Sequence, residues 1–293
     1  MSIPKIASYA MPQPSEFPNN KTQWQIDPSR AVLLVHDMQQ YFLEFYDLSQ
    51  QPIPELLQHT QQLIQAARAQ NIPVVYTAQP GDQTPEHRQL LTDFWGTGLK
   101  ADPEITKIHA DVAPTEADIV MTKWRYSAFK FSDFEERMQA WGRDQLIVCG
   151  VYAHIGCLLS AAEAFMLNIQ PFLCGDALSD FSRAEHDMAL KYASQRCAQV
   201  MATQEVVQAL AVTEQASEQQ LGISADSILH LLSEQLEIPA TEIQADDNLL
   251  LLGLDSVRLM SLVGHWQAQG AQVSFEDLAE EPTLAAWQEK LVA

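Results

Sequence analysis

Three positions that could take part in catalysis each follow or end a short apolar stretch of the sequence. They are Asp37 after AVLLV (31–35), Lys123 at the end of DIVMTK (118–123), and the pair Gly156–Cys157 after QLIVCGV (145–151). A carboxylic acid can deliver a proton, a lysine can stabilise an anion, and a cysteine thiolate can attack a carbonyl carbon. Two interpretations follow for the third position. Either Cys157 is a nucleophile, or Gly156 stands where a nucleophile has been lost.

The apolar stretches alternate with helical patterns between residues 31 and 204. We predict strands at 31–35, 72–78, 118–123, 145–151, 170–176 and 199–203, and helices at 54–70, 134–142, 155–168 and 183–198. Strands separated by helices pair in parallel, so the pattern predicts an α/β fold with a doubly wound six-stranded parallel sheet. Ligands bind outside the carboxyl ends of such strands, where Asp37, Lys123 and the turn at Gly156 should converge.

Helical register separates Cys157 from its neighbour. Successive residues of a helix point about 100° apart, so Cys157 cannot take the direction of residue 156. Cys157 lies on a stripe at helical spacing with Ala161, Ala164 and Phe165. Such a stripe faces the core of a protein, and the thiol is therefore predicted to be buried.

The pattern of the sequence changes after Leu210. Residues 211–222 are polar and show no clear period, which is typical of a linker. Four helices with no strand between them follow, at 225–237, 256–269, 275–280 and 283–292. We therefore predict a first domain at 1–212, a linker at 213–222 and a small all-α four-helix domain at 223–293.

The chain is strongly acidic, and the charge is unevenly distributed. The net charge is −21, and the 81 residues from Thr213 onward hold 14 acidic and 2 basic side chains. Such a surface repels nucleic-acid phosphates and anionic membranes, so neither is an expected partner. No apolar run reaches the roughly 18 residues that span a bilayer, no secretory signal is visible, and the four cysteines lack a C-x-x-C spacing. We therefore expect a cytoplasmic protein with free thiols.

Three stretches of the first domain carry a family resemblance. LLVHDMQQYF (33–42), MTKWRYSAF (121–129) and CGVYAHIGC (149–157) are similar to the signature stretches of the isochorismatase-like hydrolases. The resemblance covers about residues 15–212. Amidases of that family use an Asp–Lys–Cys triad, and the Gly-Val-x-x-x-x-Cys spacing aligns Gly156, not Cys157, with their nucleophile. A site without the thiol resembles the isochorismatases, which split the enol ether isochorismate into 2,3-dihydro-2,3-dihydroxybenzoate and pyruvate.

The resemblance implies a role for each of nine residues. Asp37 would protonate the terminal methylene carbon of the substrate, which requires a raised pKa. Lys123 would orient the substrate or stabilise its carboxylate, and the missing side chain of Gly156 would leave room for a substrate group or water. The implied substrate-binding residues are Gln79 and Arg88 for carboxylate or hydroxyl groups, Phe42, Trp95 and Tyr126 as apolar walls, and Tyr152 near the elbow. Arg88 has an alternative interpretation as a solvated helix residue, and Gly156 has one as a site of close packing between helix and strand.

We expect no metal ion at this site. Nicotinamidases of the family carry an Asp/His cluster after the second strand, whereas residues 78–89 offer only Asp82 and His87. His36 precedes Asp37 on a strand, where neighbouring side chains alternate between faces. We therefore expect His36 to point away from the site and to be structural.

A second motif, LGLDS (252–256), stands at the start of a helix in the small domain. It resembles the attachment site of acyl and aryl carrier proteins, where a phosphopantetheinyl transferase links 4'-phosphopantetheine to a serine, here Ser256. The alternative is an ordinary helix cap, because Ser and Asp are common there.

A hydrolase joined to an aryl carrier resembles the bifunctional proteins of catechol siderophore synthesis. The implied partners are isochorismate, the phosphopantetheinyl transferase, a 2,3-dihydroxybenzoate-AMP ligase and the condensation domain of a siderophore synthetase, and we expect a homo-oligomer. Two alternatives stay open. The chain could be a cysteine-dependent amidohydrolase fused to a carrier domain, or an inactive hydrolase fold that serves only as an interaction partner.

Overall fold

The computed structural model describes residues 3–219, 224–236, 238–268, 271 and 273–292. The chain divides into two compact units, Met1–Thr213 and Glu214–Ala293. Within the described residues, no helix is both long and apolar enough to cross a lipid bilayer.

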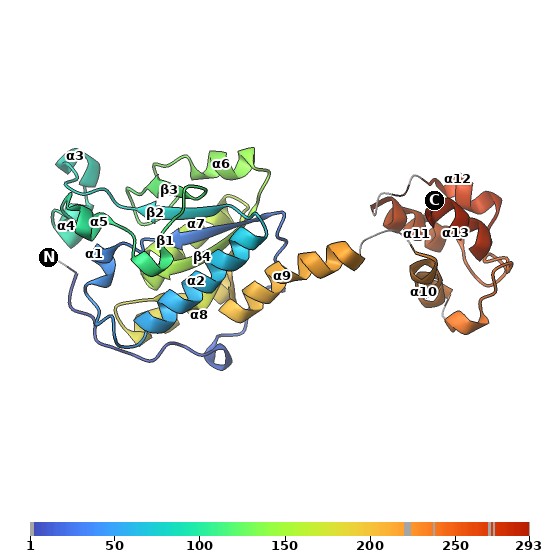
Figure 1. The fold of residues 1–293 in the computed structure, drawn as a ribbon, viewed down its shortest axis with the longest axis horizontal. Coiled ribbons are helices and arrows are strands. Elements are labelled where there is room, and N and C mark those ends of the chain that lie inside the picture. The colour runs from blue at the N-terminus through green and yellow to red at the C-terminus, as the bar shows by residue number, and fades with distance from the viewer. Residues whose placement is uncertain (1–2, 220–223, 237, 269–270, 272, 293) are drawn as a thin grey trace. The chain divides into compact units, whose positions relative to one another are not determined.

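The first unit is built on a six-stranded sheet in which all paired strands run parallel (Figure 1). Its strands are β1 (Ala31–His36), β2 (Val74–Ala78), β3 (Ile119–Thr122), β4 (Gln145–Val151), β5 (Gln170–Ser179) and β6 (Gln199–Met201). The order β3-β2-β1-β4-β5-β6 places the topological switch between β1 and β4, where doubly wound sheets bind ligands. The predicted doubly wound, six-stranded parallel sheet is confirmed.

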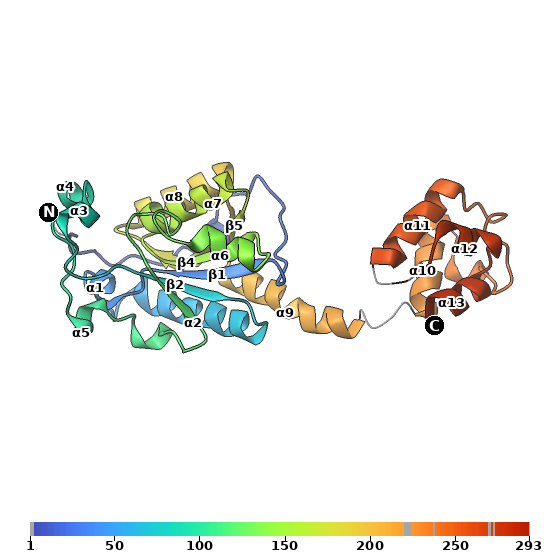
Figure 2. The ribbon, with the colours of Figure 1, turned by 90° about the horizontal axis from the view of Figure 1, so that it is seen from above.

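Helices cover both faces of this sheet (Figure 2). One face carries α2 (Ile53–Ala69) and α9 (Thr203–Gln219), and the other carries α6 (Phe134–Ala140), α7 (Leu158–Met166) and α8 (Arg183–Arg196). Strand β1 is apolar on both sides because Leu33 and Val35 pack in the first core while Val32 and Leu34 pack in the second.

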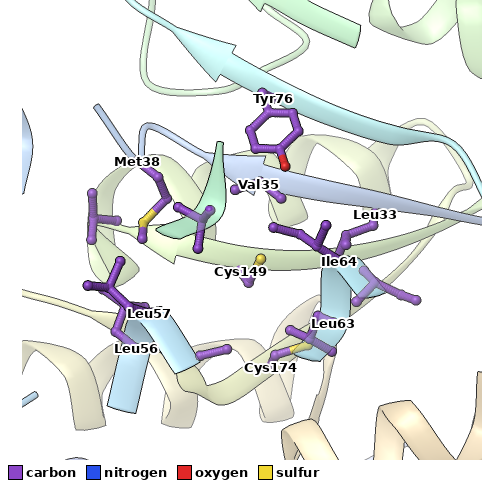
Figure 3. Packing of buried hydrophobic residues seen from close by; sticks show 14 of the residues in the cluster. Leu33, Val35, Met38, Leu56, Leu57, Leu63, Ile64, Tyr76, Cys149 and Cys174 are labelled. Carbon is purple, nitrogen blue, oxygen red and sulfur yellow. The ribbon is translucent and has the colours of Figure 1, made fainter. Parts of the chain in front are cut away.

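Helix α2 supplies many of the side chains in the first core (Figure 3). Its buried residues recur at helical spacing and include Leu56, Leu57, Leu63 and Ile64. Full burial of one such side chain contributes roughly 1.5–3 kcal/mol. This packing fixes β1, and with it the position of the residue that follows the strand.

The turn after β4 differs from the predicted regular helix start at 155. Ala153–Cys157 form a single π turn, in which the Cys157 N–H donates to the Tyr152 carbonyl oxygen at 3.3 Å. The α-helix α7 begins only at Leu158. Insertions of this kind occur frequently at functional sites.

The predicted stripe on α7 is buried at three of its four positions. Cys157, Ala161 and Ala164 are fully buried, whereas Phe165 is 46% exposed. Phe165 lies at the edge of the stripe, one residue before α7 ends, so the prediction was wrong for this residue.

The connection between β2 and β3 contains short helices that the sequence analysis did not predict. They are α3 (Pro85–Arg88), α4 (Leu91–Trp95), α5 (Pro103–Thr106) and the 3₁₀ turn η2 (Ala110–Val112). Two more short elements that were not predicted lie before β2: the 3₁₀ turn η1 (Pro14–Glu16) and α1 (Gln40–Leu43). Helices of four or five residues are too short for a 3.6-residue period to show in the sequence.

Residues 213–219, predicted as linker, continue helix α9 instead. The remaining linker residues 220–222 lie outside the described residues. The prediction undervalued local propensity, because residues 211–219 are rich in Ala, Glu and Gln, which favour helix, and contain neither Gly nor Pro.

The second unit is helical, as predicted. It contains α10 (Ala225–Leu236), the 3₁₀ turn η4 (Ala240–Glu242), α11 (Ser256–Ala268), α12 (Phe275–Glu280) and α13 (Leu284–Val292). Trp266 and Trp287 meet edge to face in its core, with ring centroids 5.6 Å apart. The indole N–H of Trp287 donates to the Leu278 carbonyl oxygen, which satisfies its polar atom inside the core.

Candidate active site

A pocket opens at the carboxyl ends of the central strands in the first unit. All nine residues that the sequence analysis assigned to the hydrolase site line it: Asp37, Phe42, Gln79, Arg88, Trp95, Lys123, Tyr126, Tyr152 and Gly156. They come from the ends of β1, β2, β3 and β4, from α1, and from the segments after β2 and β3. The parallel sheet therefore gathers residues that are up to 119 positions apart in the sequence.

A buried ion pair lies in this pocket. Lys123 Nζ is 2.8 Å from Asp37 Oδ2, and both side chains are about 95% buried. The Thr77 hydroxyl donates to Asp37 Oδ1 at 2.6 Å, and the Gln79 amide lies 3.3 Å from Oδ2. Each carboxylate oxygen thus has its own donor, as a buried charge requires.

These contacts decide the protonation of Asp37. Burial raises the pKa of its carboxyl group, but the positive charge of Lys123 and the hydrogen bonds from Lys123 and Thr77 together outweigh it. The net pKa of Asp37 is lowered. The raised pKa that we expected for the acid is therefore absent, because Lys123 stabilises the carboxylate form.

Gln79 is held in place by a second glutamine. The Gln39 side chain accepts from the Gln79 N–H at 2.7 Å and donates to the Gln79 and Thr106 carbonyl oxygens at 3.0 and 2.7 Å. This clamp ties the end of β2 to α5. The Gln79 side chain is thereby directed at Asp37.

Arg88 is buried, and the solvated alternative is wrong. Its side chain lies in the pocket, where Nε donates to the Gly96 carbonyl oxygen and Nη2 lies 3.5 Å from the Trp95 carbonyl oxygen. Nη1 is buried without a hydrogen-bond partner among the described residues. Gly98, with a φ of 82°, allows this approach, because a Cβ atom there would lie 2.5 Å from Nη1. A buried guanidinium with an unpaired donor favours an anionic ligand.

Aromatic side chains form much of the remaining wall. The indole N–H of Trp95 donates to the Tyr126 hydroxyl at 2.7 Å. The Tyr152 hydroxyl donates to the Phe42 carbonyl oxygen at 2.7 Å, so this residue offers the pocket its ring more than its hydroxyl group. Phe181 packs against Tyr152 with ring centroids 4.5 Å apart and also lines the pocket.

His36 faces this pocket as well, contrary to the expectation that it points away. Side chains alternate along a regular strand, but Asp37 has a φ of 49°, in the left-handed region. The chain leaves the extended conformation at Asp37, so two consecutive side chains reach the same pocket. Alternation in the sequence cannot reveal this local backbone change.

The imidazole of His36 fills the space beside Gly156. A Cβ atom on residue 156 would lie 2.0 Å from Cε1 and 2.6 Å from Nε2 of His36. The expected room for a substrate group or water at this point is therefore absent. Glycine is required at position 156 because the ring of His36 already occupies the volume of a side chain.

Cys157 does not reach the pocket. Its residue is fully buried among the side chains of the second core and does not belong to the pocket lining. Burial raises the pKa of its thiol well above the ordinary value. A buried thiol that resists ionisation is a poor nucleophile, which disfavours the amidohydrolase alternative.

Several lining residues were missed by sequence reasoning. They include His36, Tyr41, Arg125, Ile155 and Phe181. Phe181 lies just beyond the end of β5, so the rule that located Asp37 could have found it. It was missed because we ended that strand at residue 176, three residues before its end at Ser179. Among the described residues, no group of three or more His, Cys, Asp or Glu side chains is arranged to hold a metal ion.

The motif of the second unit lies at the start of α11. Ser256 is the first residue of the helix and is exposed. The Asp255 carboxylate accepts the Arg258 N–H at 2.8 Å and thereby caps the helix. The capping alternative therefore applies to Asp255, and the exposed Ser256 is accessible to a modifying enzyme.

Both units match known protein families. Residues 31–205 match the isochorismatase domain, and residues 226–289 match the phosphopantetheine attachment site. The first match covers more than half of the chain, and the chain therefore belongs to the isochorismatase family.

Relatives align over most or all of the chain. An isochorismatase of Bacillus subtilis (strain 168) is 46% identical over 298 residues, covering 99% of this chain and 96% of the relative. Enterobactin synthase component B of Escherichia coli (strain K12) is 43% identical over 287 residues, covering 98% and 97%. The phenazine biosynthesis protein PhzD of Pseudomonas fluorescens is 50% identical over 210 residues, covering 70% of this chain and 98% of that protein.

Solved structures support the fold of the first unit. A cysteine hydrolase from Pseudomonas syringae pv. phaseolicola 1448A superimposes with a TM-score of 0.61 at 23% identity, covering 67% of this chain and 98% of that chain. At this level of identity the likeness establishes the fold alone.

Thiol alkylation tests the placement of Cys157. We expect iodoacetamide to leave the native protein unlabelled at Cys157 and its hydrolytic activity unchanged, because the residue is buried and its thiol resists ionisation. Mass spectrometry of peptides checks the labelling, and the unfolded chain, in which all four thiols should react, is the control. Rapid labelling of native Cys157 with loss of activity would favour the amidohydrolase instead.

Proposed function

We propose that the first unit hydrolyses isochorismate to 2,3-dihydro-2,3-dihydroxybenzoate and pyruvate. The observation that carries this proposal is the buried Asp37–Lys123 pair in a pocket whose elbow residue is Gly156. Membership of the isochorismatase family and the similarity to a protein named isochorismatase support it.

An enol ether can be cleaved without a nucleophilic side chain. A proton added to the terminal methylene carbon turns the neighbouring carbon into an oxocarbenium ion, water adds there, and the hemiketal collapses to a ketone and an alcohol. Amide hydrolysis through an acyl-enzyme needs a thiolate or a similar nucleophile. Gly156 cannot supply one and Cys157 is buried outside the pocket, so protonation chemistry fits the site better.

Asp37, with Lys123, is the proposed source of the proton. Isochorismate carries two carboxylates, and negative charge close to Asp37 raises the pKa of its carboxyl group because like charges disfavour each other. Substrate binding would therefore oppose the effect of Lys123. The Lys123 ammonium, 2.8 Å from Asp37 Oδ2, is a direct source from which the carboxylate can take the proton.

Arg88 is the proposed carboxylate anchor. Its buried Nη1 lacks a partner among the described residues, and a substrate carboxylate would satisfy it. The aromatic side chains of Phe42, Trp95 and Tyr126 would enclose the apolar faces of the substrate, and Tyr152 would support them near the elbow.

The second unit, in this proposal, carries 2,3-dihydroxybenzoate as a phosphopantetheine thioester on Ser256 for non-ribosomal siderophore synthesis. The family match of residues 226–289 and the similarity to enterobactin synthase component B support this. The arm would be attached by a phosphopantetheinyl transferase, loaded by a 2,3-dihydroxybenzoate-AMP ligase and unloaded at a condensation domain. The net charge of −21 suits basic surfaces on such partners.

The same proposal includes a cellular setting and an assembly state. The free thiols of Cys149, Cys157, Cys174 and Cys197 fit a reducing compartment, and we place the reaction in the cytoplasm. We also propose that the chain forms a homo-oligomer. The predicted boundaries of the hydrolase domain (1–212) and the carrier domain (223–293) are part of the proposal.

Substitution of the acid tests the hydrolase function. We expect Asp37→Asn to lower kcat for pyruvate release from isochorismate at least about 100-fold, the order that general acid catalysis supplies. Asp118→Asn is a matched control, because it breaks a different ion pair, with Arg68, outside the pocket. Its kcat should stay near that of the wild type. Near-normal turnover by Asp37→Asn would contradict the assignment.

Substitution of Arg88 tests the carboxylate anchor. A hydrogen bond to a charged group contributes about 1.5–3 kcal/mol, so Arg88→Gln should raise the KM for isochorismate roughly 10- to 100-fold, with Arg88→Lys in between. Arg183→Gln, on the half-exposed Arg183, is the control and should leave KM unchanged. An unchanged KM in Arg88→Gln would remove Arg88 from substrate binding.

The carrier function is tested by mass. Incubation with coenzyme A and a phosphopantetheinyl transferase should add about 340 Da to the protein, and Ser256→Ala should abolish the addition. Ser261→Ala, on the same helix and also exposed, should retain it. An addition that persists in Ser256→Ala would place the arm elsewhere.

A further inference from the structure

We propose that His36 is a further catalytic residue of the hydrolase site: its imidazole stands where a side chain of residue 156 would stand, and its Nε2 atom accepts a hydrogen bond from the water that adds to the substrate. This inference rests on the proposed enol-ether hydrolysis. It assigns the second of the two groups that the reaction needs, the one that handles water.

The position of His36 is fixed by its surroundings. The ring is 1% exposed, and Nδ1 lies 2.7 Å from the Val151 carbonyl oxygen. A Cβ atom on Gly156 would lie 2.6 Å from Nε2, so this nitrogen borders the volume in which a nucleophilic side chain at 156 would stand. Both residues line the pocket.

The hydrogen-bond partners assign the protons of the ring. A contact of 2.7 Å between Nδ1 and a carbonyl oxygen requires a hydrogen on Nδ1. Burial lowers the pKa of His36 to about 4 even though the charge of Asp37 opposes this, so the ring is neutral near pH 7. Nε2 then carries a lone pair.

That lone pair has no donor among the described residues. Its one hydrogen-bond contact among those residues is with the Tyr126 carbonyl oxygen, 3.4 Å away, which is itself an acceptor and cannot donate. A buried acceptor without a donor costs free energy unless a ligand or water satisfies it. A water molecule in the pocket meets this need, and water is the second reactant.

Asp37 and His36 divide the two halves of the reaction between them. Asp37 takes hydrogen bonds from Thr77 and Lys123 and is suited to hold and pass a proton. His36, one residue earlier, offers a neutral acceptor. The left-handed backbone at Asp37 brings both side chains into one pocket, so acid and water acceptor are neighbours in the sequence.

Asp37 takes a proton from the Lys123 ammonium and gives it to the methylene carbon. A C–H bond forms there, and positive charge develops on the adjoining carbon and the ether oxygen. Water bonds to that carbon and gives a proton to Nε2 of His36. In the hemiketal, the bond between the former enol carbon and the ether oxygen then breaks, and the hydroxyl proton moves to that oxygen. The products are pyruvate and 2,3-dihydro-2,3-dihydroxybenzoate. The imidazolium then loses its Nε2 proton to water and Lys123 regains a proton from water, which restores the ring with its hydrogen on Nδ1. The net reaction consumes one water molecule.

The weak basicity of His36 is compatible with this role. Water bonded to an oxocarbenium carbon is a far stronger acid than an imidazolium ion, so a weak base is sufficient to remove its proton. A strongly basic group would instead compete for the proton of Asp37 before the substrate reacts.

Two variants of His36 separate the acceptor from the structural contact. His36→Asn keeps an amide donor near the Nδ1 position, within reach of the Val151 carbonyl oxygen, and removes the acceptor at Nε2. His36→Gln extends an amide oxygen toward the Nε2 position. We expect kcat for pyruvate release to fall about 100-fold in His36→Asn with a small change in KM, and His36→Gln to be intermediate.

Deuterium incorporation into recovered isochorismate distinguishes a catalytic role of His36 from a purely structural one, because loss of a structural contact would not cause it. If water capture is slowed after protonation, the cation reverts by losing a proton. Isochorismate recovered from D₂O should then carry deuterium at its methylene carbon with His36→Asn, and none with the wild type or with Asp37→Asn. Thermal unfolding checks the fold of each variant. If His36→Asn does not fold, His36→Leu replaces it, and we again expect a lowered kcat and deuterium in the recovered isochorismate.

The outcomes are distinguishable. Unchanged kcat, or a lowered kcat with unlabelled recovered substrate, would overturn the role of His36 while the proposed function stands. Failure of the wild type to release pyruvate from isochorismate would overturn the proposed function itself, and the role of His36 with it. Lowered kcat together with deuterium in the recovered substrate supports both.

Discussion

The hydrolase unit is organised around a carboxylate and an ammonium group that are buried together. Removing two charges from water is expensive, and their attraction compensates only when their other lone pairs and protons are also satisfied. Thr77 and Gln79 satisfy the carboxylate of Asp37, and the Gln39 clamp fixes Gln79. The pair therefore depends on three adjacent strands, β1, β2 and β3, ending at the same edge of the sheet.

That arrangement could be predicted from the sequence because a parallel sheet buried on both faces leaves a simple pattern. Its central strands are largely apolar, and the charged residues that follow β1 and β3 mark the edge where ligands bind. Asp37 and Lys123 were found in this way. Arg88 and Trp95 lie on helices of four and five residues, which have no detectable period, and only the family resemblance pointed to them. The helical conformation of residues 213–219 was not predicted for a related reason, since polar residues with high helix propensity extend α9 without an apolar stripe.

The properties of His36 and Gly156 could not be predicted, because they depend on backbone conformation and on contacts across the sheet. Strand alternation assigns His36 and Asp37 to opposite faces, and a single φ of 49° reverses that assignment. The requirement for glycine at 156 comes from a ring 120 positions earlier in the chain, a contact that no local pattern of the sequence encodes. When two consecutive polar residues stand at the end of a strand, the sequence alone thus does not determine which face of the sheet each side chain points to.

The elbow also determines which chemistry the shared pair can support. The volume beside residue 156 can hold a side chain on that residue or the imidazole of His36, but not both, because 2.0 Å is far inside the contact distance of two carbon atoms. Thiolate attack needs a nucleophile in that volume, with the ion pair to manage its proton. Enol-ether hydrolysis needs an acid and a site for water, and in our proposal the imidazole provides the latter. The same Asp37–Lys123 pair is compatible with either reaction. The choice between the two reactions therefore depends on whether residue 36 or residue 156 places its side chain in this volume. A change of reaction class in this fold would then require residues 36 and 156 to change together.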